Sequence, residues 1–390
     1  MKSLLPDLDL LRRLVACDTT SARSNLGLVD LVCDYLDRPG VRLERLPSPD
    51  GRKANLLAWI GPEPGPDRAG LILSGHTDVV PAGEPEWESD PFTLSEHGDH
   101  LYGRGACDMK GFLALAANCA ARAAARAATA PLAAPLVLLF TYDEELGTLG
   151  AQQLVRDWPS GRPLPRAAVV GEPTSLSVVR LHKGHLKLRV QVGGRSAHSS
   201  LPHLGRNAVE AAGQVIQALA RLRRKLETER PFHHQHFPEV PFATLNVAKV
   251  EGGVAINIVP DRATIDLGIR LLPGMESAAM VERVRAAIHA ARPDGQVEVT
   301  VLSDSPPMLC PEDSPAARAL SDLLGQRTTI GASYASDAGP LQGLGVEAVL
   351  WGPGSIEVAH RPNEFLPRAE MERAAALLPT LVERLCGAEA

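Results

Sequence analysis

Histidine and carboxylate side chains recur at the ends of apolar segments in this sequence. His76 and Asp78 close the apolar run of "LILSGHTDVVP" (71–81), and residues two apart in a strand point to the same side. A single pair of this kind is weak evidence for a site, because surface turns also carry polar residues. Other titratable residues stand where further apolar runs end or a helix begins: Asp108, Glu144, Glu145, Glu172 and His360.

Two imidazoles and several carboxylates form a mixed nitrogen and oxygen set that suits zinc, with cobalt or manganese as substitutes. The set is too large for one tetrahedral ion, but it suits two ions that share one carboxylate. For each residue alone, a helix cap or a surface turn is the simpler interpretation. Their joint occurrence favours a two-metal site, because ligands of open α/β sheets bind beyond the carboxyl ends of the strands.

The elements that must position these residues are short, almost continuously apolar segments. Residues 54–60, 69–75, 134–142 and 166–173 are expected to be buried strands, and the alanine-rich segment 111–130 is expected to be a helix. Such strands alternating with helices predict an α/β fold with a mostly parallel sheet, covered on both faces. The same character returns near the end of the sequence, with a strand in 346–354 and a helix in 367–387.

The middle of the chain has a different pattern, which predicts an inserted α+β domain. Residues 181–194 alternate like a half-exposed strand, and the following segments predict the order βαββαβ of a ferredoxin-like domain. The predicted domains are therefore residues 1–180 with 305–390, and residues 181–304. The helices of the insert are expected at 207–226 and 275–291, and its later strands at 243–253, 263–274 and 296–303.

Composition narrows the class of protein. The 390 residues suffice for two or three domains, and a net charge of −6 without basic blocks argues against a nucleic-acid partner. No apolar run approaches the roughly 18 residues of a membrane span, and the first 20 residues are typical of an amphipathic helix instead of a signal peptide. The six cysteines form no CxxC pair, which argues against a structural zinc site, and sparse cysteines in a long chain without an export signal suit a cytoplasmic protein. The histidines of "PFHHQHFPEVP" (His233, His234, His236) are expected in a solvated loop, with a further metal site as the alternative.

Six segments resemble, in order, the motifs of the M20 family of metallopeptidases and deacylases. They are "SGHTDVVP", "LYGRGACDMKG", "TYDEE", "GEPT", "GRSAHSS" and "GPGSIEVAHRPNEF", and the resemblance spans nearly the whole chain. Within the family, "GEPTSLSVVRLHKGH", "FATLNVAKVEGG" and "IRLLPGM" look most like the members that deacetylate N²-acetyl-L-ornithine. Two departures are the loosely similar "GASYASDAGPLQ", which keeps an acidic residue as Asp337, and Cys107, where a small residue such as alanine is expected.

The resemblance implies a role for each candidate in the first domain. Asp108 is expected to bridge two divalent ions, with zinc as the first choice and cobalt as the alternative. His76 and Glu172 would complete one ion's ligands, and Glu145 and His360 those of the other. Asp78 would hydrogen-bond the far nitrogen of His76 and fix its tautomer. Glu144, which adjoins a ligand, would be the general base.

The resemblance also assigns residues of the inserted domain. His198 matches the histidine that reaches across a homodimer interface into the partner's active site and stabilises the oxyanion. Asn257 and Arg270 match positions that contact substrate, with Arg270 holding a carboxylate as a bidentate fork. Ordinary surface and strand roles are the alternatives for all three residues.

The function implied is hydrolysis of a small N-acyl amino acid. The expected reaction converts N²-acetyl-L-ornithine and water to L-ornithine and acetate, a step of arginine biosynthesis. N-acetylcitrulline, succinyl-diaminopimelate and the substrates of other aminoacylases or carboxypeptidases of the family are alternatives that the ligand residues do not separate. A non-catalytic metal-binding homologue is the alternative of a different class, against which the presence of Glu144 argues.

Overall fold

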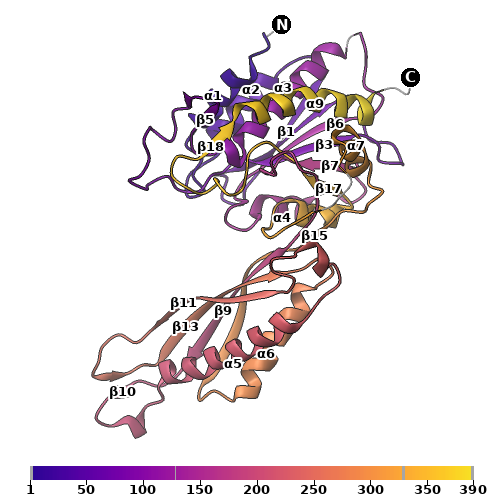
Figure 1. The fold of residues 1–390 in the computed structure, drawn as a ribbon. Coiled ribbons are helices and arrows are strands. Elements are labelled where there is room, and N and C mark those ends of the chain that lie inside the picture. Colours follow the sequence, from indigo (N-terminus) through magenta and orange to yellow (C-terminus); the bar gives the residue numbers. More distant parts are fainter. Residues whose placement is uncertain (1–2, 128, 327–329, 388–390) are drawn as a thin grey trace. The chain divides into compact units, whose positions relative to one another are not determined.

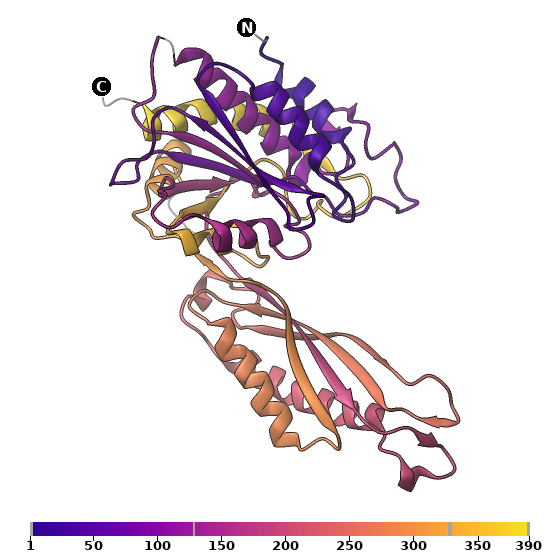
Figure 2. The same cartoon turned by 180° about the vertical axis from the view of Figure 1, so that it is seen from behind.

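A computed structural model describes the fold of residues 3–127, 129–326 and 330–387 (Figures 1 and 2). The chain divides into two compact units. Unit 1 consists of Met1–Arg180, Cys310–Ile330 and Ser336–Ala390, and unit 2 consists of Leu181–Leu309 and Gly331–Ala335. Among the described residues, no helix combines the length and the hydropathy that crossing a bilayer requires.

The second boundary of the insert differs from the predicted one at 304/305. Strand β14 continues to Ser305, and the short strand β15 (Met308–Leu309) then pairs with β8 (Val179–His182). Five more residues therefore stay with unit 2, and Gly331–Ala335 join it from farther along the chain. These pairings are long-range, so no local pattern marks them in the sequence.

The main sheet of unit 1 has the order β1-β2-β6-β3-β7-β17-β8 in the described residues. Its four middle strands, β6, β3, β7 and β17, are parallel, whereas β2 pairs with β6 and β1 with β2 in the antiparallel sense. The predicted mostly parallel α/β fold is confirmed, with an antiparallel edge. The strands are β1 (Val41–Pro47), β2 (Ala54–Ile60), β3 (Leu71–His76), β6 (Leu136–Thr141), β7 (Ala167–Val170) and β17 (Glu347–Leu350).

Helices cover both faces of this sheet, which is why its middle strands are buried along their whole length. Helix α3 (Gly111–Arg126) packs with α9 (Arg368–Cys386) on one face, and α4 (Leu149–Asp157) packs with α8 (Ala338–Leu341) on the other (Figure 1). The small alanine side chains of α3 let it approach its neighbours closely. The remaining elements of unit 1 are α1 (Asp7–Val15), α2 (Leu26–Leu36), β4 (Ser95–His97), β5 (His100–Tyr102), α7 (Pro315–Leu324) and β18 (Phe365–Pro367).

Unit 2 is built as βαββαβ, in agreement with the predicted ferredoxin-like order. Its antiparallel sheet has the order β11-β13-β9-β14. Buried and partly exposed residues alternate along β9, because two helices cover only one face of the sheet. The elements are β9 (Gly184–Gly193), α5 (Ala208–Thr228), β11 (Thr244–Gly252), β13 (Arg262–Leu271), α6 (Ser277–Ala291) and β14 (Gln296–Ser305).

Candidate metal centre

The candidate ligands follow the carboxyl ends of neighbouring parallel strands in unit 1. His76 is the last residue of β3, Glu145 follows β6, and Glu172 follows β7. His360 lies in the loop after β17, and Asp108 lies in the turn before α3. Because parallel strands all end at the same edge, the sheet brings these side chains together.

The carboxylate of Asp108 lies between the two histidines. Its Oδ1 atom is 3.0 Å from Nε2 of His76, and its Oδ2 atom is 3.3 Å from Nε2 of His360. The same nitrogen of His360 is 2.9 Å from Oε1 of Glu145. Two groups of three potential ligands result, which share Asp108: His76, Asp108 and Glu172, and Asp108, Glu145 and His360, with their ligand atoms within 4.8 Å of one another.

The residues present fit a pair of divalent cations. Oε1 of Glu172 is buried and has no hydrogen-bond partner among the described residues, which is costly for a carboxylate unless a cation meets it. Burial raises the pKa of Glu172 well above its ordinary range, and the charge of Asp108 raises it further. Hydrogen bonds that His360 donates to the carboxylates of Asp108 and Glu145 raise the pKa of His360 to about 10. Acids crowded in this way repel one another, and positive ions relieve that repulsion.

The prediction for Asp78 was wrong in its contact with His76. Nδ1 of His76 lies 2.9 Å from the main-chain oxygen of Asp78, whereas the Asp78 carboxylate is 3.8 Å away. A carbonyl oxygen only accepts, so Nδ1 donates, and neutral His76 has its lone pair on Nε2, the atom that faces Asp108. The main chain of Asp78 therefore sets the tautomer that the prediction assigned to its side chain.

The carboxylate of Asp78 is occupied by other donors. Its Oδ1 accepts from the main-chain nitrogen of Glu144 at 3.0 Å, and its Oδ2 accepts from the main-chain nitrogen of Glu145 at 3.3 Å. The hydroxyl of Ser21 also donates to Oδ2, at 2.8 Å. Asp78 thus holds the segment that carries Glu144 and Glu145 against the end of β3.

Glu144 is in neither ligand group, although it adjoins Glu145. Burial raises the pKa of Glu144 well above its ordinary range, and the negative charges of nearby acids raise it further. These acids are Glu172, Glu145 and Asp337. The charge of His76 acts in the opposite direction but does not cancel the rise. A carboxylate with a raised pKa beside a metal site is suited to take up a proton. Asp337 itself is buried, with a pKa raised to about 6 by burial, and it accepts a hydrogen bond from Thr141.

Several residues that support the site were not predicted from the sequence. Ser21 contacts Asp78 from 57 positions away, and no local pattern marks it. Arg104 and Glu364 form a buried ion pair at 2.9 Å next to the turn of Asp108. Both residues lie inside the motifs that carry Asp108 and His360, but nothing in those motifs shows that their charged side chains are buried together.

The three candidates of unit 2 fall into two places. His198, in β10 (Ala197–His198), pairs with β12 (Ile258–Val259), next to Asn257, whose main-chain oxygen accepts from Ser199. This pair of short strands lies next to the start of β13, whereas Arg270 lies near the end of β13. At about 3.3 Å per residue, roughly 25 Å of strand separates the two places. One chain therefore does not bring Arg270 together with His198 and Asn257 within unit 2.

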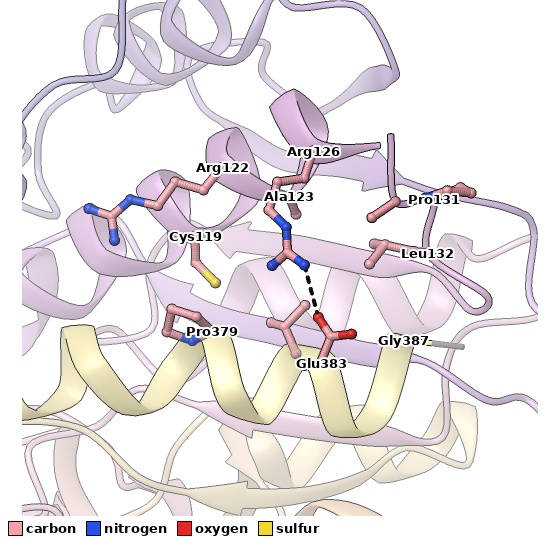
Figure 3. Close-up of a pocket in the computed structure, with 11 residues that line it drawn as sticks. Cys119, Arg122, Ala123, Arg126, Pro131, Leu132, Pro379, Glu383 and Gly387 are labelled. Carbon is pink, nitrogen blue, oxygen red and sulfur yellow. Dashed lines mark hydrogen bonds and ion pairs between the residues drawn. The ribbon is translucent and has the colours of Figure 1, made fainter. Parts of the chain in front are cut away.

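Other candidate features lie outside the metal centre. Among the described residues, neither ligand group includes His233, His234, His236 or Cys107. The buried Cys107 thiol donates to the main-chain oxygen of Ser355. A cavity of about 280 Å³ lies between α3, α9 and residues 130–132, and none of the predicted site residues lines it (Figure 3). Its lining includes Cys119, Arg122, Leu132 and Pro379, and an ion pair of 3.4 Å between Arg126 and Glu383.

Comparison with known proteins agrees with this geometry. The family model described as peptidase family M20/M25/M40 matches residues 72–384. The acetylornithine deacetylase of Yersinia pseudotuberculosis serotype O:1b (strain IP 31758) is 37% identical, and the alignment covers 99% of each chain. The acetylornithine deacetylase of Proteus mirabilis is 36% identical over 98% of this chain and 97% of its own.

Solved structures share the fold at low sequence identity. An M20 family metallo-carboxypeptidase from Sulfolobus solfataricus superimposes with a TM-score of 0.74 at 19% identity, covering 98% of this chain and 99% of its own. A dinuclear metal-binding M20 peptidase from Bacillus subtilis gives a TM-score of 0.67 at 16% identity, covering 97% of both chains. With the family match over most of its length and relatives aligned along nearly all of it, the chain belongs to peptidase family M20/M25/M40.

Proposed function

We propose that this metal-dependent amide hydrolase removes the acetyl group from N²-acetyl-L-ornithine, giving L-ornithine and acetate. The observation that carries the chemistry is the position of Asp108, whose two oxygens each face one histidine and which both ligand groups share. The substrate rests on the full-length similarity to acetylornithine deacetylases at 36–37% identity. A place in arginine biosynthesis follows from the product.

Two divalent ions, zinc or cobalt, would be held by the residues of the two groups. His76 and Glu172 would hold one ion, Glu145 and His360 would hold the other, and Asp108 would bind both. The mixed imidazole and carboxylate donors suit these metals, and a relative of the same fold is described as a dinuclear metal-binding peptidase. When bound, such ions polarise the amide carbonyl and acidify a water molecule.

Glu144 would act as the general base and then as the general acid. Its raised pKa lets its carboxylate accept a proton from the attacking water, and the protonated acid can then donate to the departing amine. Asp78 would keep Glu144 in place through the hydrogen bond to its main-chain nitrogen. The mechanism needs no serine or cysteine nucleophile, and Cys107 is buried with a pKa raised well above its usual value by burial and by nearby carboxylates.

His198, Asn257 and Arg270 would contact the substrate from two chains of a homodimer. His198 and Asn257 lie roughly 25 Å along the sheet from Arg270, so one small substrate does not reach both places on the same unit 2. A partner chain that lends His198 and Asn257 would remove this difficulty. Arg270 would hold the substrate's carboxylate, and His198 would stabilise the oxyanion.

We place the enzyme in the cytoplasm. All six cysteines are free thiols, five of them buried, as expected for a reducing compartment.

A substrate panel tests the proposed function. Purified protein with zinc or cobalt is assayed with acetylornithine, acetylcitrulline, succinyl-diaminopimelate and acetylated neutral amino acids, and metal content is measured in parallel. Acetylornithine is expected to give the highest kcat/KM, with up to two ions per chain and loss of activity on chelation. A higher kcat/KM with another member of the panel would mean that this compound, and not acetylornithine, is the preferred substrate. Full activity in metal-free protein would contradict the metal centre, and absence of any turnover would favour a non-catalytic homologue.

A further inference from the structure

Glu364 is a buried carboxylate with an unusual set of partners. Only 1% of the residue is exposed, and both oxygens accept two hydrogen bonds each. Oε1 accepts from the main-chain nitrogens of Cys107 at 2.9 Å and Asp108 at 3.0 Å. Oε2 accepts from the main-chain nitrogen of Gly105 at 3.0 Å and from the Arg104 guanidinium at 2.9 Å. All four donors belong to one five-residue segment.

That segment ends at the residue that both metal-ligand groups share. Gly105 has a φ of +78°, and a Cβ added to it would lie 2.6 Å from Val79, so glycine is required for the turn. The turn points three main-chain N–H groups, those of Gly105, Cys107 and Asp108, toward one place, where the Glu364 carboxylate accepts from all three. The direction of the Asp108 carboxylate therefore depends on a main chain that Glu364 holds in shape.

Glu364 also belongs to the loop of another ligand, since it lies four residues after His360. Its own main-chain oxygen accepts from Gly103 at 3.0 Å. Arg104 donates in addition to the main-chain oxygens of Arg361 at 3.3 Å and Pro81 at 3.1 Å. The pair of Arg104 and Glu364 thus joins three segments, those that follow His76, precede Asp108 and follow His360.

We infer that Glu364 is a positioning residue that holds Asp108 and His360 in register to receive the metal ions. The inference rests on the proposed two-metal centre but not on the identity of the substrate. Asp108, Glu145 and Glu172 repel one another, so their main chains must be held by other contacts before an ion compensates their charge. Mutation of a group that orients metal ligands in this way typically lowers metal affinity by about 10–100-fold.

The test is metal binding by a Glu364→Gln variant of the full-length chain. An amide presents one NH₂ group to donors that need an acceptor, and it removes the nearer of the two carboxylates beside the buried Arg104, leaving Glu84 at 3.4 Å. Co²⁺ is titrated into metal-free protein, and binding is read from its visible absorption in competition with a chelator. The variant is expected to bind Co²⁺ about 10–100-fold more weakly than the parent.

A matched control is Glu44→Gln. Glu44 lies in β1 of unit 1 and accepts two hydrogen bonds from Arg162, at 2.8 and 2.6 Å. The free energy of unfolding of each metal-free variant is measured as well. A merely structural role for Glu364 would lower that free energy and leave the Co²⁺ affinity of the folded chain unchanged, which would overturn the inference.

A second variant covers the case in which Glu364→Gln does not fold. Glu364→Asp keeps the charge next to Arg104 but withdraws both oxygens from the main-chain donors. It is expected to fold and to bind Co²⁺ more weakly than the parent. An affinity within about twofold of the parent would overturn the inference. If the parent itself binds no Co²⁺, the proposed metal centre fails, and this outcome is distinct from equal binding by parent and variant.

Discussion

Oδ1 of Asp78 accepts a hydrogen bond of 3.0 Å from the main-chain nitrogen of Glu144. Asp78 lies two residues beyond His76, whose Nδ1 contacts the Asp78 main-chain oxygen. One residue therefore orients a candidate metal ligand with its main chain and the candidate base with its side chain. Asp78 links the end of β3, which carries His76, with the segment after the adjacent strand β6, which carries Glu144 and Glu145.

An Asp78→Asn variant is expected to lower kcat more than it raises KM. The asparagine NH₂ group faces donors, so the main chain of Glu144 and Glu145 shifts, whereas the main-chain contact with His76 remains. A loss of about 10–100-fold in kcat is expected, with a smaller effect for Ser21→Ala, which removes one of the donors to Asp78. Steady-state kinetics of both variants check this, and unchanged kcat for Asp78→Asn would contradict the anchoring role.

Glu144→Gln and Glu145→Gln are expected to fail in different ways. Glutamine at 144 cannot accept the proton of water, so kcat should fall by at least about 10²–10⁴-fold while metal content stays nearly intact. Glutamine at 145 loses the charge of a ligand, so one ion should bind more weakly and excess metal should partly restore activity. Metal content and kcat are measured side by side. Loss of an ion from Glu144→Gln with both ions retained by Glu145→Gln would reverse the two roles.

Mixing two inactive variants tests the sharing of His198 between chains. In a hybrid dimer of His198→Ala and Glu144→Ala chains, one site has both groups intact and the other has neither. Random exchange at equal amounts gives hybrids in half of the dimers, so about a quarter of the parent activity should return. Subunit exchange is verified with differently tagged chains. No recovery despite exchange would count against the shared site.

The stability of unit 2 is expected to depend on pH through His182. This side chain is fully buried, and burial lowers its pKa from 6.5 to about 4. Below about pH 6.5, His182 is therefore protonated in the unfolded chain, whereas in the folded chain it is protonated only near pH 4. The free energy of unfolding is therefore highest, as far as His182 is concerned, above pH 6.5. It falls as the pH drops, by about 2 kcal/mol between about pH 7.5 and pH 5.

The measurement is chemical unfolding of His182→Asn and the parent at both pH values, followed by circular dichroism. Asparagine can still donate to the main-chain oxygen of Lys183, which Nδ1 of His182 contacts at 3.0 Å, but it does not titrate. The variant should lose less stability than the parent on acidification. His289→Asn, at an exposed position of α6, should keep the parent's pH dependence. An equal pH dependence in His182→Asn would refute the assignment.

The candidate metal ligands that lie at strand ends could be predicted from the sequence because two local signals coincide. Buried parallel strands are visible as apolar runs, and the residue that follows each run marks the edge of the sheet where ligands bind. His76 and Glu172 were found in this way. Strand direction was not predictable locally, since the run 54–60 is as apolar as its neighbours but pairs antiparallel with β6.

Contacts that depend on long-range approach could not be predicted. The partners of the Asp78 carboxylate include Ser21, and those of Glu364 lie about 256–260 positions away. No pattern within one segment distinguishes such an acid from a solvated one. The position of Asp78 two residues after His76 suggested a contact between the two side chains. Only the packing of Glu144 and Glu145 against Asp78 shows that its carboxylate accepts from their main-chain nitrogens instead.

The place of β17 in the main sheet has a consequence for the synthesis of the chain. β17 pairs with β7 and β8, although roughly 180 residues, including all of unit 2, are translated between Ala167 and its partner Glu347. At about 5–20 residues per second, the ribosome needs on the order of ten seconds or more to supply this strand. Until then, β7 has an unpaired edge that can associate with other chains. His360 emerges later still, so a growing chain can fold unit 2 well before it can assemble a complete pair of metal-ligand groups.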